Sequence, residues 1–411
     1  MKLYIDPGTG SMLFAILMGV FGALSYIFRN WIVKLKFLLT GGKTEKVDKN
    51  KIPIVIFSDD KRYWSVFEPV CREFNKRKID VVYMTASADD KALDNNYEHI
   101  KVEFIGEGNK AFARLNFLKA VIVMSTTPGL DVYQWKRSKN VDYYIHLPHA
   151  ASDITLYRMF GIDYYDAVLL SGDYQAEDVR ALEKMRNLPE KELVQVGIPY
   201  MDEMVARLSK TDSSSDSITV LLAPSWGDSA IFSKYGGKII EQLISTGYHI
   251  IVRPHPQSFT SESKLIEGLI NEFSENENIE WNRDADNFDV LCRSDILISD
   301  FSGVIFDFAL VHNKPVIYTN TGFDKSPYDA WWLDKEPWTL SVLPKIGEEL
   351  NDGNLDNIKT IIDNCLTDEK YADGRDEARK ETWNYMGCGA VRTVDYVMKK
   401  YDEITTETGG E

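Results

Sequence analysis

The sequence predicts two α/β domains, each built on a parallel β-sheet, preceded by an apolar segment that reaches a membrane. Three observations support this prediction. From residue 51 onward, short apolar runs alternate with stretches of helical periodicity. A serine-rich polar stretch at 209–217 divides this pattern in two, and residues 12–28 carry no charge. Short buried strands that alternate with helices are typical of a parallel sheet covered on both faces.

The first element is the uncharged run 12–28, which we expect to form a transmembrane or membrane-anchor helix within residues 1–45. Its length is close to the ~20 residues that cross a bilayer. Arg29, Lys34, Lys36 and Lys43 follow it, and by the positive-inside rule this side stays in the cytoplasm. A signal peptide is disfavoured because the charges lie on the wrong side. A buried core helix and a segment that only embeds in the bilayer remain alternatives.

The next elements are the strands and helices of two successive α/β sets. In the first set we expect strands at 54–57, 81–84, 120–124, 168–170 and 193–196, with a helix at 174–185. In the second set we expect strands at 219–222, 249–252, 279–281, 296–299 and 315–318, and helices at 236–245, 264–273, 287–292 and 303–311.

This order predicts two Rossmann-like domains, at 50–208 and at 218–385, followed by a C-terminal helix with an acidic tail at 386–411. The stretch 209–217 serves as the linker. Two such domains face each other across a cleft, and ligands bind at the carboxyl ends of their strands.

Composition excludes several classes of function. The net charge of −16 argues against a nucleic-acid-binding protein, which needs clustered Lys and Arg. The four cysteines are scattered, which is typical of reduced thiols in the cytosol. The six histidines show no metal-ligand spacing, so we predict neither a metal site nor a cofactor.

The most informative motif runs from Ser299 to Ala309. A buried strand ends at Ser299, and the turn Asp300–Gly303 opens a helix. Backbone N–H groups at that point, with the Ser302 hydroxyl, form a cradle for phosphate oxygens. Gly303 allows close approach of the backbone, and Asp307 is placed to reach a ribose hydroxyl. Ordinary helix capping by Asp300 or Ser302 is the alternative.

Two histidine-bearing turns follow strand ends. Prolines on both sides of His255 fix the turn Arg253–Pro256, which presents Arg253 as a diphosphate clamp and His255 as a group that stabilises charge on phosphate. In the first domain, His149 is the candidate general base on an acceptor hydroxyl, with Asp153 as a possible orienting group. His146 is the better candidate for a packed histidine.

Other strand-end turns complete the predicted cleft. Ser225 and Trp226 follow the strand at 219–222, and Trp226 either stacks on a base or ribose or is buried in the core. The stretch 328–338, which contains three tryptophans, is an acceptor loop, a membrane-facing loop or part of the core.

These motifs together resemble the CDP-glycerol glycerophosphotransferase family, the teichoic-acid primases and polymerases, over roughly residues 120–330. The residues that carry the resemblance are His149, Gly197-x-Pro199-x-x-Asp202, Ala223–Trp226, Arg253–Pro256, Ser299–Ala309 and Lys314–Val316. The resemblance implies a GT-B fold in which 50–208 is the acceptor domain and 218–385 the CDP-donor domain. It also implies transfer of glycerol phosphate from CDP-glycerol, with release of CMP, at the inner face of the cell membrane. The acceptor is then a lipid-linked or glycan component of the cell envelope.

The resemblance also implies roles for individual residues. His149 matches the catalytic base, Arg253 and His255 match the phosphate-contacting turn, Ser302 matches the pyrophosphate-binding serine, and Asp307 matches an acidic residue on the next helix. The chain departs from the family pattern at Ala150-Ala151, where Gly-Thr is usual, at Gly303, where a second serine is usual, and at Tyr200, where arginine is frequent. These departures leave CDP-ribitol or another alditol-phosphate donor open. A nucleotide-sugar glycosyltransferase or epimerase, and an inactive membrane-anchored nucleotide-binding protein, are the alternative functions.

Overall fold

The computed structural model describes residues 51–210, 217–284 and 286–407. The predicted membrane segment 12–28, most of the predicted linker and the last four residues lie outside the described residues. Among the described residues, no helix combines the length and the apolar composition needed to cross a membrane.

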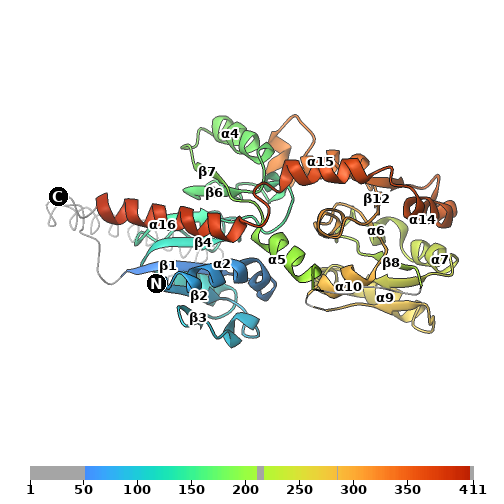
Figure 1. Ribbon diagram of the computed structural model, residues 1–411, viewed down its shortest axis with the longest axis horizontal. Helices are drawn as coiled ribbons and strands as arrows, with labels where there is room; N and C mark the ends of the chain where they lie inside the picture. The colour runs from blue at the N-terminus through green and yellow to red at the C-terminus, as the bar shows by residue number, and fades with distance from the viewer. Residues whose placement is uncertain (1–50, 211–216, 285, 408–411) are drawn as a thin grey trace, which may run out of the picture. The chain divides into compact units, whose positions relative to one another are not determined.

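The first α/β set forms a seven-stranded sheet with the order β3-β2-β1-β4-β5-β6-β7, and every pair of neighbouring strands is parallel. The central strand β1 pairs on one side with β2 and on the other with β4 (Figure 1). The strands are β1 Ile52–Ser58, β2 Val81–Thr85, β3 Ile100–Phe104, β4 Ala120–Ser125, β5 Val141–His146, β6 Ala167–Leu170 and β7 Glu192–Gln195.

The second set forms a six-stranded parallel sheet with the order β10-β9-β8-β11-β12-β13. Its strands are β8 Thr219–Leu222, β9 His249–Val252, β10 Ile279–Trp281, β11 Ile296–Ser299, β12 Val316–Thr319 and β13 Gly347–Leu350. Both sheets reverse their winding direction between two central strands, at β1/β4 and at β8/β11. In open α/β sheets, such switch points are where ligands bind, beyond the carboxyl ends of the strands.

Helices connect the strands and cover both faces of each sheet. They are α2 Trp64–Lys76, α3 Asn109–Leu115, α4 Tyr174–Arg186, α5 Pro199–Leu208, α6 Ile231–Tyr235, α7 Lys238–Ile244, α8 Ser258–Ser261, α9 Ser263–Glu272, α10 Phe288–Arg293, α11 Val304–Phe306, α12 Trp338–Ser341, α13 Leu343–Ile346, α14 Ile358–Thr367, α15 Ala372–Thr382 and α16 Gly389–Glu407. Short 3-10 turns are η1 Lys61–Tyr63, η2 Lys91–Asp94, η3 Ile154–Leu156, η5 Asp329–Trp332 and η6 Leu355–Asn357, and η4 Asp307–Val311 is a π-helical turn.

Two predicted helices differ from the observed ones. The helix expected at 236–245 begins only at Lys238, because Gly236 with φ 54° and Gly237 separate α6 from α7. The helix expected at 303–311 is α11 followed by η4. A π-helical turn places side chains off the 3.6-residue period, and such turns are frequent at functional sites.

Alternating side chains of the central strands enter separate cores on the two faces of each sheet. Ile54 and Ile56 join one core while Val55 and Phe57 join the other. The helix α16 returns to the first sheet, where Val394 packs in the same core as Ile54, and Figure 1 shows it running along these strands. The C-terminal helix is thus part of the first α/β layer, although it follows the second in sequence.

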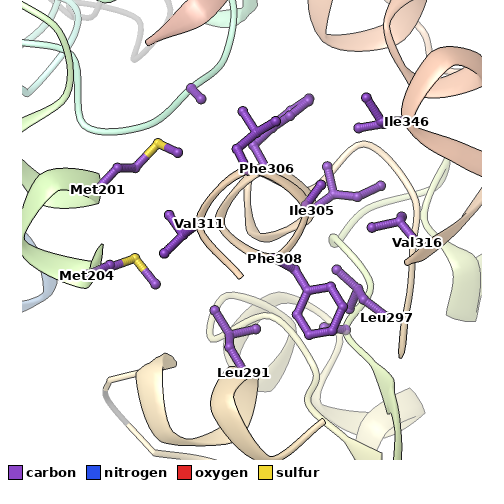
Figure 2. Close-up of a cluster of buried hydrophobic side chains, with 14 of the residues drawn as sticks. Met201, Met204, Leu291, Leu297, Ile305, Phe306, Phe308, Val311, Val316 and Ile346 are labelled. Carbon is purple, nitrogen blue, oxygen red and sulfur yellow. The ribbon is translucent and has the colours of Figure 1, made fainter. Parts of the chain in front are cut away.

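A shared apolar cluster joins the two sheets. Met201 and Met204 of α5 are buried in the same cluster as Phe306 and Val311, and Figure 2 shows both methionines pointing toward the α11–η4 segment. Phe306 is fully buried. Because α11 follows the turn that was predicted to hold phosphate, this packing ties the position of that turn to the first domain.

Candidate active site

A cleft of about 700 Å³ is lined by residues of both α/β sets. This volume is within the range of small-molecule sites in proteins. Six of the nine predicted site residues line it: His149, Arg253, His255, Ser302, Gly303 and Asp307. The remaining three, Ser225, Trp226 and Asp300, lie in the turns that support this wall.

The first and second sets approach closely in this cleft. A β-carbon added at Gly303 would lie 3.8 Å from the β-carbon of Ala150, the residue after His149. Gly303 itself has an ordinary helical φ of −57°, so its lack of a side chain matters for space rather than for backbone strain. The His149 turn and the Ser302 turn therefore face each other across a short gap.

His149 is held at one ring nitrogen by a threonine. Its Nδ1 lies 2.8 Å from the Thr126 hydroxyl and 3.4 Å from the Tyr157 hydroxyl. The ring of Tyr63 packs against the imidazole, with 5.1 Å between the ring centroids. Burial, reinforced by the nearby charge of Arg62, lowers the pKa of His149 to about 4. The imidazole is therefore uncharged at neutral pH, as a general base must be.

Asp153 does not orient His149. Its carboxylate accepts a 2.6 Å hydrogen bond from the backbone N–H of Thr339, and its own N–H donates to the Thr339 hydroxyl at 2.9 Å. This reciprocal pair joins the loop after β5 to the start of α12. The sequence suggested a partnership between Asp153 and His149 because they are close in the chain, whereas the turn after β4 supplies the partner of His149.

His255 is held at Nδ1 by a backbone N–H group. The backbone N–H of Gln257 donates to Nδ1 at 3.1 Å, so Nδ1 accepts and Nε2 carries the hydrogen of the neutral ring. Burial, together with the charges of Arg62 and Arg253, lowers the pKa of His255 to about 4. The turn thus presents a neutral N–H donor, which suits contact with a phosphate oxygen.

Arg253 is anchored at the edge of the cleft. Its guanidinium donates to the side-chain oxygen of Asn282 and, at 2.8 Å, to the carbonyl of Asp284. Burial lowers the pKa of Arg253, but an arginine remains charged at every physiological pH. Both partners of the guanidinium are uncharged groups, so Arg253 keeps its positive charge uncompensated by a direct ion pair at these contacts.

Asp300 fixes the turn after β11 by accepting hydrogen bonds from the segment after β8. Its buried carboxylate accepts the N–H groups of Ser225 at 2.9 Å and Ile231 at 3.1 Å. Burial raises the pKa of Asp300 to about 6, against the opposing effect of these N–H groups. The interaction fixes the turn after β8 to the turn after β11, so Asp300 shapes the cleft while Ser302 and Gly303 line it. Trp226 is 37% exposed and its ring lies 6.4 Å from that of His255.

Asp307 lies at the floor of the cleft in a chain of polar groups. Asn287 donates to its Oδ2 at 3.2 Å, and the Tyr200 hydroxyl donates to Asn287 at 3.0 Å. Burial raises the pKa of Asp307 to about 7, and its Oδ1 is buried with no partner among the described residues. The side chain of Tyr200 comes from α5, so this series of hydrogen bonds links the two α/β sets.

Other motifs prove to be structural. Asp202 accepts the backbone N–H groups of Gly387 and Gly389 and the indole N–H of Trp383, which fastens the start of α5 to the segment that leads into α16. Lys314 donates to the carbonyls of Cys292 and Ser294 at the end of α10. Asp202 thus ties α5 to the segment that leads into α16, whereas Lys314 acts within the second set. Neither residue belongs to the lining of the cleft described above.

Motif analysis missed Thr126, Arg62 and Tyr63. Arg62 and Tyr63 follow β1, and Thr126 follows β4, the two strands at the switch point of the first sheet. The available signal was topological: polar residues after each of two neighbouring central strands meet at one edge of the sheet. The three tryptophans of 328–338 differ in their surroundings. Trp331 and Trp332 are exposed, whereas Trp338 stacks on Tyr174 with 4.9 Å between ring centroids.

Comparison with known proteins finds one matching family and several similar structures. The family described as CDP-Glycerol:Poly(glycerophosphate) glycerophosphotransferase matches residues 120–331. Among solved structures, the wall teichoic acid polymerase TagF, as a variant soaked with CDPG, is similar with a TM-score of 0.56 and 15% identity, covering 92% of this chain and 98% of that one. No curated protein sequence matches the chain.

Nucleotide-sugar enzymes have the same architecture. MnaA of S. aureus with UDP is similar with a TM-score of 0.56 and 14% identity, covering 86% of this chain and 97% of that one. UDP-GlcNAc 2-epimerase of Neisseria meningitidis is similar with a TM-score of 0.53 and 12% identity, covering 85% of this chain and all of that one. These likenesses establish the GT-B-like arrangement of two parallel α/β sheets that the sequence predicted. The fold alone does not choose among the activities it supports.

Proposed function

This chain belongs to the CDP-glycerol:poly(glycerophosphate) glycerophosphotransferase family and is an enzyme of that family, and we propose that the cleft between the His149 and Ser302 turns carries the transfer. The acceptor hydroxyl attacks the β-phosphorus of CDP-glycerol, and the bond from that phosphorus to the oxygen bridging the two phosphates breaks. Glycerol phosphate joins the acceptor, CMP leaves, and His149 takes the hydroxyl proton.

The observation that carries this proposal is the meeting of two separate motifs in one cleft. His149 and Ala150 line it from the first sheet, and Ser302 and Gly303 line it from the second. A general base must lie within hydrogen-bond reach of the hydroxyl it activates, and the reacting phosphorus must lie beside that hydroxyl. A β-carbon added at Gly303 would touch that of Ala150, at 3.8 Å, so the two turns lie close enough for one substrate in the adjoining cleft to contact both.

The proposed phosphate site uses groups that carry charge or donate hydrogen bonds. The His255 Nε2–H and the Arg253 guanidinium hold the diphosphate from one side. The Ser302 hydroxyl and the backbone N–H groups of Gly303 and Val304 hold it from the other side. The next two N–H groups, of Ile305 and Phe306, already donate to the carbonyls of Ser302 and Gly303. As negative charge moves to the departing CMP, these donors stabilise it without needing to reorient.

The test compares His149→Ala with His99→Ala in the full-length protein. His99 is a half-buried histidine paired with Asp80 at the first sheet, so it controls for removal of an imidazole. We expect CMP release in the presence of acceptor to fall by about 10²- to 10⁴-fold for His149→Ala, the range for loss of a general base, and to be unchanged for His99→Ala. Full activity of a folded His149→Ala protein would refute the base assignment.

The donor is tested by a panel of CDP-glycerol, CDP-ribitol and UDP-GlcNAc. The first two distinguish glycerol phosphate from another alditol phosphate. UDP-GlcNAc is included because 2-epimerases share the fold. Turnover of UDP-GlcNAc with no turnover of either CDP-alditol would overturn the proposed donor, and binding of nucleotides without turnover of any would favour a non-catalytic role.

We also propose that the enzyme works at the inner face of the cell membrane on a membrane-associated cell-envelope acceptor. The support is the uncharged run 12–28 and the basic residues after it. Leu17→Arg places a charge in that run, and we expect it to move the protein from the membrane fraction to the supernatant. If the native protein and the variant are both found in the membrane fraction, other parts of the chain hold the protein there.

A further inference from the structure

The turn after β4 holds the buried hydroxyl of Thr126 in a fixed position. The Ser125 hydroxyl donates to the carbonyl of Phe57 at 2.9 Å, and the Thr127 hydroxyl donates to the Asp59 carboxylate at 2.8 Å. The backbone N–H of Leu147 donates to the carbonyl of Ser125 at 3.0 Å. The residues on both sides of Thr126 are thus fixed to the ends of β1 and β5, so Thr126 has little freedom to move.

Thr126 is fully buried, and its hydroxyl lies 2.8 Å from His149 Nδ1. The packing of Tyr63 on the imidazole further restricts the ring. With Nδ1 turned to Thr126, Nε2 is the nitrogen that a ligand in the cleft can meet. A neutral imidazole has one nitrogen with hydrogen and one with a lone pair, and the partner of one nitrogen decides the state of the other.

Two arrangements of hydrogen are possible at this contact. If His149 Nδ1–H donates to the Thr126 oxygen, Nε2 has a free lone pair and can accept a proton. If a hydroxyl donates to Nδ1, Nε2 carries hydrogen and His149 cannot act as a base. A hydroxyl is able to take either role, so the surrounding groups determine which arrangement forms.

Tyr157 is the other hydroxyl near Nδ1, and a second histidine lies beside it. Tyr157 lies 3.4 Å from His149 Nδ1 but 3.2 Å from Nε2 of the fully buried His146. Burial lowers the pKa of His146 to about 3, so this ring stays neutral and its Nε2 can accept a hydrogen bond from the Tyr157 hydroxyl. If the Tyr157 hydroxyl donates to His146, it does not donate to His149. The Thr126 oxygen, at the shorter distance, then accepts a hydrogen bond from His149 Nδ1–H.

We propose that Thr126 is a positioning residue that accepts a hydrogen bond from His149 Nδ1–H and so keeps the Nε2 lone pair facing the cleft. This inference rests on the proposed role of His149 as the base. It assigns to a hydroxyl the orienting task for which Asp153 was the candidate in the sequence. Because Thr126 carries no charge, it sets the direction of the ring without raising the basicity of the imidazole as a carboxylate would.

The test uses Thr126→Val, which removes the hydroxyl and keeps the shape, and Thr126→Ser, which keeps the hydroxyl. We expect Thr126→Val to lower kcat by about fivefold or more, since one hydrogen bond supports roughly that change in a tautomer ratio, with little change in the KM for CDP-glycerol. Thr126→Ser should restore kcat to within about threefold of the native value. Tyr157→Phe should retain activity, because it removes only the competing hydroxyl.

A second measurement reads the tautomer directly. In full-length protein labelled with ¹⁵N at histidine, the ring shifts of His149 should report Nδ1–H in the native protein and in Thr126→Ser, and a gain of Nε2–H in Thr126→Val. Native-like kcat in Thr126→Val, equal losses in the valine and serine variants, or Nε2–H in the native protein would each overturn the inference. An active His149→Ala protein would instead remove the base assignment, and the NMR result would then still show what Thr126 does to the ring.

Discussion

Replacing Asp307 by asparagine should make the protein more stable at pH 8. The carboxyl is buried, and its pKa is raised from 3.8 to about 7 by burial. Between these two values the unfolded chain has lost the proton that the folded chain still holds. Stability therefore falls as pH rises through this window, and the loss is complete above pH 7. Asparagine keeps an oxygen for Asn287 and has no charge to bury.

The size of the effect follows from the two pKa values. The difference of about 3 units, at 1.36 kcal/mol per unit, gives about 4 kcal/mol as the limit. About 1–2 kcal/mol of this is already present at pH 5, since pH 5 is about one unit above 3.8. The stability advantage of Asp307→Asn over the native protein should therefore grow by about 3 kcal/mol between pH 5 and pH 8. Comparing the two pH values removes any constant effect of the amide itself.

The comparison variant is Asp300→Asn, the same chemical change at a second buried carboxyl. The pKa of Asp300 is raised less, to about 6, so the stability of this variant relative to the native protein should change by only about 1 kcal/mol between pH 5 and pH 8. Asp300 accepts the N–H groups of Ser225 and Ile231, so an amide nitrogen there would face a donor. We expect Asp300→Asn to cost about 1–3 kcal/mol at pH 8, the usual cost of a buried group without its partner. The free energy of unfolding is measured by urea titration at pH 5, 6, 7 and 8 for all three proteins.

A stability difference between Asp307→Asn and the native protein that does not change with pH would refute the reasoning. We also expect Asp307→Asn to raise the KM for CDP-glycerol, because a charged carboxylate that destabilises the fold is explained by its contact with a ligand. A variant that is more stable and equally active would show that Asp307 has no part in donor binding.

The remaining predictions concern the histidines and two glycines. His149 and His255 have pKa values of about 4 in the ligand-free cleft, so the acid limb of the kcat/KM profile should lie near pH 4–5. The acid limb of the kcat profile should lie at higher pH, because the bound diphosphate favours the charged imidazoles. A kcat limb at lower pH than the kcat/KM limb would contradict this. Gly197→Ala should lower Tm and cost about 2 kcal/mol or more, because φ is +88° and the new β-carbon would lie 2.2 Å from a backbone oxygen. Gly303→Ser should keep the native Tm and activity, whereas Gly303→Val should block the cleft beside Ala150, which a β-carbon at position 303 already touches at 3.8 Å, and lower kcat/KM. Equal activity of the two variants would contradict this close approach of the two turns.

The sequence predicted central strands well because their apolar runs are continuous. The strands expected at 219–222, 249–252 and 296–299 coincide with the inner strands β8, β9 and β11. One edge strand, β10, was also predicted, at 279–281. The sequence did not predict the edge strands β3 and β13, whose residues IKVEF and GEEL carry charge and are partly exposed. An edge strand has one unpaired side and little apolar surface, so its residues resemble those of a loop.

The site was predicted unevenly for a related reason. Arg253, His255 and Ser302 each stand in a short motif at a strand end, which periodicity and proline placement can locate. The partner of His149 could not be found in this way, because Thr126 is 23 residues away and belongs to a different strand end. Contacts between strand ends depend on the order of strands in the sheet, and that order became known only from the structure.

The two histidines show how an acidic protein can hold an anionic donor. Both are neutral, because burial and the charge of Arg62 oppose a second positive charge. A backbone N–H of Gln257 makes His255 a donor at Nε2, which suits phosphate. A hydroxyl at Thr126 allows His149 to be an acceptor at Nε2, which suits an acceptor alcohol. In the proposed mechanism the same side chain therefore performs opposite tasks on the two walls of the cleft, and the partner of Nδ1 determines which task each one performs.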